Sequence, residues 1–219
     1  MRKSILFILL NAILLSSCTN KDLPKPEEGT GIRGKQFGID KNINEETIDN
    51  YLNRDDVCYR DMRMLIDPAN YEAIGGDSNL SGYIKGFKVV PFPYICTPFD
   101  LPSEVGNTYQ GETLFSFENN TYTPNYSESM DLLVELFPKD LNIFLMCGGG
   151  GYAKMMKDLL ISLGWDKDKI YNVGGYWFYE GKNKIEVKKI DEDNNVTYDF
   201  DLVDYYEFDF SKLTKNKWN

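Results

Sequence analysis

The 219-residue sequence contains no histidine. This absence excludes a Cys/His catalytic dyad, a histidine-ligated zinc site and an imidazole general base. Positive charge is also scarce, because 24 lysine and arginine side chains face 34 acidic ones and the formal net charge is −10. We therefore expect no nucleic-acid partner and no binding to an anionic membrane through charge alone.

The apolar run at residues 4–15 is too short to span a bilayer comfortably. It follows two basic residues and precedes small residues and Cys18, an order that is typical of a bacterial lipoprotein signal. We expect residues 1–17 to be a signal peptide and acyl chains on Cys18 to anchor the protein in the bacterial cell envelope, outside the cytoplasm. The alternatives are an ordinary signal peptide and a buried amphipathic helix that ends in cysteine.

The rest of the chain has a size suited to one domain with decorations. Residues 18–37 are polar and rich in proline and glycine, as expected of a lipidated tether. Residues 38–181 would form the domain and residues 182–219 a C-terminal β extension. Within the domain, the polar and aromatic residues 99–126 predict an inserted hairpin or a long loop.

Three cysteines, Cys58, Cys96 and Cys147, remain once Cys18 is assigned to lipid. An odd number outside the cytosol leaves at least one thiol unpaired unless an intermolecular bridge forms. Because histidine is absent, a reactive cysteine would depend on the backbone or on another side chain for its activation.

The spacing of apolar residues predicts strands that alternate with helices. Helical spacing covers residues 42–52, 68–74, 127–137 and 153–163, and strand patterns cover residues 56–63, 87–94, 142–146 and 169–173. Such an alternation predicts an α/β fold with a parallel sheet flanked by helices on both faces. Ligand sites in these sheets lie beyond the carboxyl ends of the strands, which is where Cys147 stands.

Four consecutive glycines follow Cys147 and precede a predicted helix. Such a run is costly to order, because glycine loses the most conformational entropy on folding. A loop that leads into a helix N-terminus can direct its backbone N–H groups inward and favour negative charge, so Cys147 would be held as a thiolate or a persulfide anion. The alternative is a buried structural cysteine beside a glycine turn, and the loop alone does not decide between the two.

Four short motifs follow one another between residues 55 and 181. They are DMR at 61–63, GYIKGF at 82–87, CGGGGY at 147–152, and LGW at 163–165 followed by IYNVGG at 170–175. In this order and spacing the chain resembles the rhodanese-like family of sulfurtransferases. The resemblance implies a rhodanese-like parallel sheet and a cysteine loop at the end of its central strand.

The same resemblance implies sulfur transfer without a metal or cofactor. Cys147 would be the nucleophile and would carry sulfane sulfur as a persulfide from a donor such as thiosulfate to a thiol acceptor. Asp61 and Arg63 would support the loop. The backbone N–H groups that would bind the anion belong to Gly148, Gly149, Gly150, Gly151 and Tyr152.

Two positions depart from the family pattern. The sixth loop residue is Tyr152 where arginine, serine or threonine is usual, and Tyr83 replaces the usual histidine. With no cationic side chain in the loop, an anionic donor would depend on backbone dipoles and at most on Lys154. We therefore expect poor affinity for thiosulfate and more room for a bulkier donor or a protein acceptor.

Two other functions compete with sulfur transfer. Cysteine loops for phosphate take one more residue and finish with arginine, but Ala153 occupies that position, so phosphoryl transfer is disfavoured. The stronger alternative is a non-catalytic, lipid-anchored binding module on the same scaffold, in which residues 99–126 and the C-terminal segment contact a protein partner.

The lipid anchor can be tested directly. Replacing Cys18 with serine should release the protein from the membrane fraction of cells, because the acyl chains would have no attachment site. Fractionation followed by immunoblotting measures this, with Cys96→Ser as the control for loss of a cysteine. Membrane association that survives in Cys18→Ser would argue against lipidation.

Overall fold

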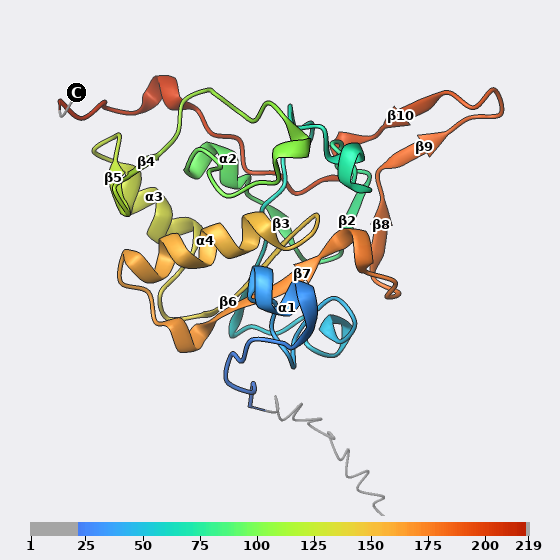
Figure 1. The fold of residues 1–219 in the computed structure, drawn as a ribbon, viewed down its shortest axis with the longest axis horizontal. Coiled ribbons are helices and arrows are strands. Elements are labelled where there is room, and N and C mark those ends of the chain that lie inside the picture. Colours follow the sequence, from blue (N-terminus) through green and yellow to red (C-terminus); the bar gives the residue numbers. More distant parts are fainter. Residues whose placement is uncertain (1–21, 218–219) are drawn as a thin grey trace, which may run out of the picture.

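The computed structural model describes residues 22–217, and its centre is a four-stranded parallel sheet (Figure 1). The strand order is β3-β1-β6-β7, with β3 at Lys88–Val89, β1 at Val57–Asp61, β6 at Asn142–Cys147 and β7 at Ile170–Gly175. All three pairings are parallel, so the carboxyl ends of the strands meet at one edge. The predicted α/β fold with a parallel sheet is confirmed.

Three α-helices cover one face of the sheet: α2 (Phe92–Ile95), α3 (Ser129–Leu136) and α4 (Gly151–Ser162). Helix α4 forms because its apolar residues recur at helical spacing and face the core. Its buried residues are Tyr152, Ala153, Met155, Met156, Leu159 and Leu160, and they pack with β6 residues Ile143 and Leu145. Gly164, with φ +91°, follows the last turn and ends the helix.

The other face of the sheet is covered differently. In the described chain it packs against 3₁₀ turns and irregular segments, chiefly residues 39–52, whose Ile43 and Ile48 are fully buried against that face. The expectation of helices on both faces is therefore wrong for this face.

The helix predicted over residues 42–52 is reduced to the 3₁₀ turn η1 (Ile48–Asn50). Polar side chains accept hydrogen bonds from backbone N–H groups in this segment. The Asp40 carboxylate accepts the N–H groups of Asn42 and Ile43, and Thr47 Oγ1 accepts the N–H of Asn44. Such local bonds compete with the helical pattern.

The strand predicted over residues 87–94 is also shorter than expected. Only Lys88–Val89 pair as β3, and the chain then turns into α2. Pro93 lies in the first turn of α2, where a missing N–H costs nothing and the fixed φ suits a helix.

The N-terminal residues 22–37 fold back onto the domain instead of forming a free tether. Helix α1 (Gly31–Phe37) packs beside α4, and the Tyr171 hydroxyl on β7 donates to the Pro24 carbonyl at 2.9 Å. The tether expected over residues 18–37 is therefore wrong from residue 22 onward. Residues 1–17 and Cys18 lie outside the described residues.

The inserted segment, expected to be a hairpin or a long loop, contains a hairpin with β4 at Phe115–Glu118 and β5 at Thr121–Pro124. Asn119 and Asn120 make its two-residue turn with positive φ angles of 50° and 59°. Asparagine tolerates this left-handed conformation better than most residues, and the geometry suits the twist of a hairpin.

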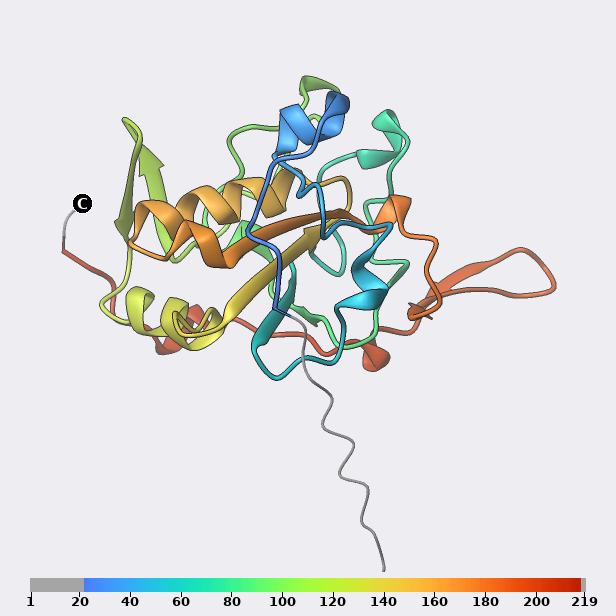
Figure 2. The ribbon, with the colours of Figure 1, turned by 90° about the horizontal axis from the view of Figure 1, so that it is seen from below.

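The C-terminal segment adds further β structure. Strand β8 (Lys184–Glu186) pairs with β2 (Gly82–Ile84), and β9 (Lys188–Ile190) pairs with β10 (Val196–Tyr198) in a hairpin that projects from the body, at the end of the molecule opposite β4–β5 (Figures 1 and 2). The chain then returns along β3, where the Val89 N–H donates to Asp204 O at 2.7 Å. This contact covers the edge of the sheet.

Short 3₁₀ turns complete the structure: η2 (Tyr71–Ile74), η3 (Ser103–Val105), η4 (Lys167–Lys169), η5 (Tyr176–Phe178), η6 (Phe200–Leu202) and η7 (Phe210–Lys212). Two of them, η2 and η5, lie beside the carboxyl ends of the strands and border the candidate site. None of the helices within residues 22–217 has the length and apolar character needed to cross a membrane.

Candidate functional site

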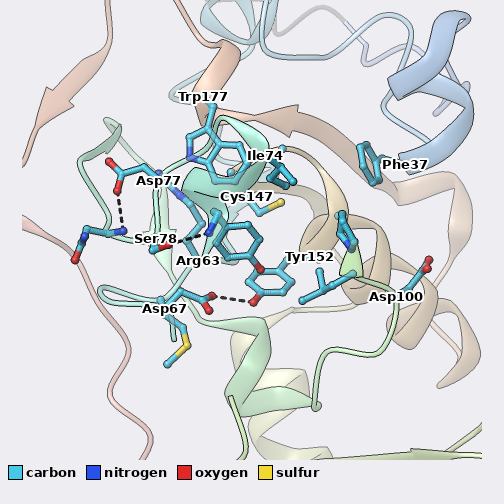
Figure 3. Close-up of a pocket in the computed structure, with 18 residues that line it drawn as sticks. Phe37, Arg63, Asp67, Ile74, Asp77, Ser78, Asp100, Cys147, Tyr152 and Trp177 are labelled. Carbon is cyan, nitrogen blue, oxygen red and sulfur yellow. Dashed lines mark hydrogen bonds between the residues drawn. The ribbon is translucent and has the colours of Figure 1, made fainter. Parts of the chain in front are cut away.

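Cys147 is the last residue of β6 and lies at the carboxyl edge of the sheet, opposite Gly175 of β7. Its side chain contributes to the wall of a pocket that Arg63, Tyr152 and Trp177 also line (Figure 3). The residue is only 3% exposed. The position agrees with the strand-end site expected from the sequence.

Backbone N–H groups point at the sulfur. The Gly150 N–H donates to Cys147 Sγ at 3.1 Å, and the N–H groups of Tyr152 and Ala153 at the start of α4 also lower the pKa of the thiol by hydrogen bonding. Ala153 was not among the expected donors. The structure thus forms a cradle from residues 150–153, at the positive end of the α4 dipole.

Burial changes the pKa of Cys147 more than the backbone N–H groups of the cradle do. It raises the pKa of Cys147 above its ordinary value, despite the three backbone hydrogen bonds. The loop sequence alone did not decide between a held thiolate and a buried structural cysteine, and the raised pKa favours the neutral thiol near neutral pH. Burial likewise raises the pKa of Cys58 and raises that of Cys96 to about 12, and all three cysteines are free.

Three carbonyl groups of the glycine loop are held on their outer sides. The backbone N–H of Trp177 donates to Gly148 O at 3.2 Å. Arg33 Nη2 donates to Gly149 O at 3.3 Å. Asn172 Nδ2 donates to Gly150 O at 3.0 Å. In a trans peptide the C=O and the following N–H point in opposite directions, so holding Gly149 O outward turns the Gly150 N–H inward.

Arg33 is itself fixed in place. It comes from α1, forms an ion pair with Glu45, and its guanidinium lies 3.6 Å from the centroid of the Phe178 ring. No local pattern in the sequence indicates this contact, because Arg33 lies 116 residues before Gly149.

Asn172 is fully buried on β7 and joins three segments. Its Nδ2 also donates to Phe37 O at 2.7 Å, and its Oδ1 accepts the Gly174 N–H at 3.0 Å. Sequence analysis missed this residue, although one signal was present. A polar amide interrupts an otherwise apolar strand at residues 170–173, and a buried amide requires hydrogen-bond partners.

The consecutive glycines serve different purposes. Gly150 has φ +109°, and a Cβ there would lie 3.2 Å from Ile39 Cδ1. A Cβ on Gly148 would lie 2.3 Å from the Trp177 ring, so this glycine permits the indole to cover the loop. A Cβ on Gly151 would meet only Phe37 Cε1 at 3.8 Å, so sterics do not require that glycine.

Asp61 and Arg63 form a buried ion pair beside the loop. Arg63 Nε donates to Asp61 Oδ1 at 3.0 Å, Arg63 Nη2 donates to Gly82 O at 2.8 Å, and the guanidinium lies 4.3 Å from the centroid of the Tyr176 ring. The remaining nitrogen, Nη1, is buried without a hydrogen-bond partner. A buried donor left in this state costs about 1–3 kcal/mol.

The side chains of Tyr152 and Lys154 are each held by an acidic residue. The Tyr152 hydroxyl donates to Asp67 Oδ2 at 2.8 Å, which directs it to the pocket wall (Figure 3). Lys154 pairs with Asp158 at 2.8 Å on α4 and does not line the pocket with Cys147. Among the described residues, the cationic side chain that lines the pocket is Arg63.

No protein-family model matches the chain, and neither a curated protein nor a solved structure does. Within residues 22–217, no group of three or more histidine, cysteine or acidic residues is placed to hold a metal ion.

The loop conformation can be tested by a matched pair of variants. Gly150→Ala should lower the free energy of unfolding by about 1–2 kcal/mol, because an alanine resists positive φ. Gly151→Ala should leave it unchanged or slightly higher, since Gly151 has space and starts a helix. Urea denaturation measures both. Equal losses in the two variants would contradict the loop geometry.

The protonation state of Cys147 can be tested by alkylation with iodoacetamide. Only the thiolate reacts, and the pKa of the Cys147 thiol is raised above the ordinary 9.0. The alkylation rate should therefore rise about tenfold per pH unit between pH ~7 and ~9. Peptide mass spectrometry compares the alkylation rate of Cys147 with the rates of Cys58 and Cys96. These two should react more slowly because they do not line this pocket. A rate plateau that begins near pH ~7 would show a stabilised thiolate instead.

Proposed function

We propose that the protein is a rhodanese-like sulfurtransferase, anchored to a membrane through Cys18, which carries sulfane sulfur as a persulfide on Cys147. One observation carries the proposal: Cys147 Sγ lies in a pocket at the carboxyl edge of a parallel sheet and accepts the Gly150 N–H at 3.1 Å. The motif order described above supports the family assignment.

The reaction has two sulfur transfers. The Cys147 thiol loses its proton to water at the pocket mouth, and its thiolate attacks the terminal sulfur of the donor. A bond forms between Sγ and that sulfur, and the bond between the sulfur and the rest of the donor breaks, with its electron pair leaving on the donor. A thiolate acceptor then attacks the outer sulfur and restores the Cys147 thiolate.

The cradle suits the intermediate. A persulfide carries its negative charge on the outer sulfur, which extends from Sγ toward the pocket. The N–H groups at the start of α4 stabilise such an anion through hydrogen bonds and the helix dipole. Trp177, packed over Gly148, shields the loop from solvent on one side. This arrangement replaces the imidazole that the sequence lacks.

A binding module is the second candidate. The hairpin β9–β10 projects from the body, and its Ile190 and Val196 are 62% and 46% exposed. Exposed apolar side chains on a projecting hairpin suit a protein partner. In this case sulfur chemistry at Cys147 would be absent, which the following experiment detects.

The proposed function predicts one sulfur atom added to Cys147. After incubation with a sulfane-sulfur donor, the peptide that contains Cys147 should gain the mass of one sulfur, and addition of cyanide should release it as thiocyanate. Cys147→Ser should abolish both signals. Cys96→Ser, which removes a buried thiol away from the pocket, should retain them. Thiocyanate formation that persists in Cys147→Ser, or no sulfur on Cys147 with any donor, would refute the assignment.

Arg33 should act as a positioning residue. In Arg33→Met the Gly149–Gly150 peptide loses one outer hydrogen bond, so persulfide formation should slow by about threefold to tenfold. The alkylation curve of Cys147 should also move to higher pH, because a weakened Gly150 N–H contact leaves the thiolate less stabilised.

Lys35→Met provides the control, because it removes a positive charge from the same helix α1. It should change neither the rate nor the alkylation curve. Thermal unfolding of each variant establishes that the protein is folded at the assay temperature. An alkylation curve in Arg33→Met that superimposes on the wild-type curve would contradict the positioning role.

A further inference from the structure

The described chain enters the body at the edge of the sheet where the parallel strands begin, which we call the amino edge. Arg54 hydrogen-bonds Asp56, which raises the pKa of the guanidinium, and the nearby charge of Asp22 raises it further. Asp56 immediately precedes β1, and its carbonyl accepts the N–H of Asn142, the first residue of β6, at 3.0 Å. Asp22 therefore lies near the amino ends of β1 and β6.

Two contacts hold the residues after Asp22 at the amino end of β7. Lys25 forms an ion pair with Asp168, two residues before that strand, at 3.2 Å. The Tyr171 hydroxyl, near the start of the strand, donates to Pro24 O at 2.9 Å. The point of entry is thus fixed to the body at the amino edge, and Figure 1 shows this start of the described chain, in blue, well away from β2.

The Cys147 pocket opens at the other edge of the sheet. Strand β6 runs from Asn142 to Cys147, a distance of about 17 Å at the usual rise per residue. Because the strands are parallel, Arg63 after β1 and Trp177 after β7 line the pocket from the same carboxyl edge. The entry point of the chain and the pocket therefore lie at opposite edges of the sheet.

The chain between the expected lipid and the body is short. Cys18 stands four residues before Asp22, and four fully extended residues span at most about 14 Å. A folded body of about 200 residues has a radius of gyration of about 16 Å, so its diameter exceeds this reach. With acyl chains on Cys18 in a bilayer, the body cannot turn far enough to bring the carboxyl edge of its sheet to the lipid surface.

Charged side chains favour the same orientation. Lysines border the amino edge, where Lys167 and Lys169 lie in η4 directly before β7 and Lys139 lies in the loop before β6. Aspartates alternate with these lysines, so this edge carries charges of both signs. The pocket is lined by Asp77 and Asp100, which an anionic lipid surface would repel.

We propose that the amino edge of the sheet faces the membrane and that the Cys147 pocket opens toward the aqueous phase, so that its sulfur acceptor is a water-soluble thiol and not a thiol at the lipid surface. The inference rests on the proposed function, including the lipid on Cys18, and adds the orientation of the site and the class of its partner. The short tether sets this orientation and requires no specific binding of lipid by the body.

Acetylation of lysines by a membrane-impermeant reagent tests the orientation. The lipidated full chain, added to the outside of preformed phosphatidylcholine vesicles, is compared with Cys18→Ser in solution. Acetylation of Lys25 and Lys167 should fall about threefold or more on the vesicles, because lipid headgroups cover them, whereas that of Lys189 on β9 should not change.

Two results would overturn the orientation: protection of Lys189 in place of Lys25 and Lys167, or equal acetylation of all three lysines on vesicles and in solution. Flotation of the vesicles shows whether the protein is anchored. Lipidated protein that does not float with them would refute the anchor itself.

A longer tether provides the matched control. Insertion of about twenty glycine and serine residues after Asn20 keeps Cys18 and gives the tether a mean reach of about 27 Å. The variant should still float with the vesicles, but acetylation of Lys25 and Lys167 should return toward its level in solution. Protection that the insertion leaves unchanged would contradict control of the orientation by the tether.

Sulfur transfer tests the class of partner. Cys147 of the anchored protein is loaded from inorganic polysulfide and offered glutathione or phosphatidylthioethanol, a lipid with a thiol on its headgroup, at equal total thiol. The acceptor thiolate attacks the outer sulfur, which gives the acceptor persulfide and restores the Cys147 thiolate. Rates with Cys18→Ser and the same two thiols correct for their different reactivity.

After this correction, transfer to glutathione should be at least about tenfold faster than transfer to the lipid thiol, because the native tether cannot bring the two sulfur atoms together. The longer tether should raise transfer to the lipid thiol alone. Equal transfer to both thiols with the native tether would overturn the partner class and leave the proposed function standing. Failure to load Cys147, or to transfer sulfur to either thiol in any variant, would refute the function itself.

Discussion

The orientation of a single peptide unit, between Gly149 and Gly150, underlies the arrangement around Cys147. Its N–H donates to Sγ at 3.1 Å, and its C=O accepts from Arg33 at 3.3 Å on the opposite side. Because the peptide is planar, each of these bonds restricts the other. Asn172 holds the next carbonyl in the same way. The cysteine loop is therefore positioned from α1 and β7, and not by its own sequence alone.

Burial of the sulfur has two consequences for chemistry. Removal from water raises the pKa of the Cys147 thiol more than the cradle lowers it. The same burial would protect the proposed persulfide on Cys147 from competing reactions with solvent species. The site thus holds the Cys147 sulfur in a fixed position, and ionisation of the thiol depends on pH. A chain without histidine has few other ways to stabilise a sulfur anion.

Local sequence patterns predicted the strand, loop and helix from β6 to α4, because an apolar run, a glycine run and helical spacing follow one another within about twenty residues. For residues 99–126 they predicted a hairpin or a long loop, and the structure has the β4–β5 hairpin there. They failed at residues 42–52, where the side chains of Asp40 and Thr47 take the backbone hydrogen bonds. They also failed at Arg33, whose contact with Gly149 joins segments far apart in the chain. Such long-range contacts leave no local periodic signal.

The central claim is that the glycine-loop amides hold a sulfur anion on Cys147. A crystal structure of the protein after treatment with a sulfane-sulfur donor tests it most directly. The account predicts an additional sulfur bonded to Sγ, within hydrogen-bond distance of N–H groups between Gly150 and Ala153. Sulfur bound elsewhere, or an added sulfur that points away from these N–H groups, would contradict it.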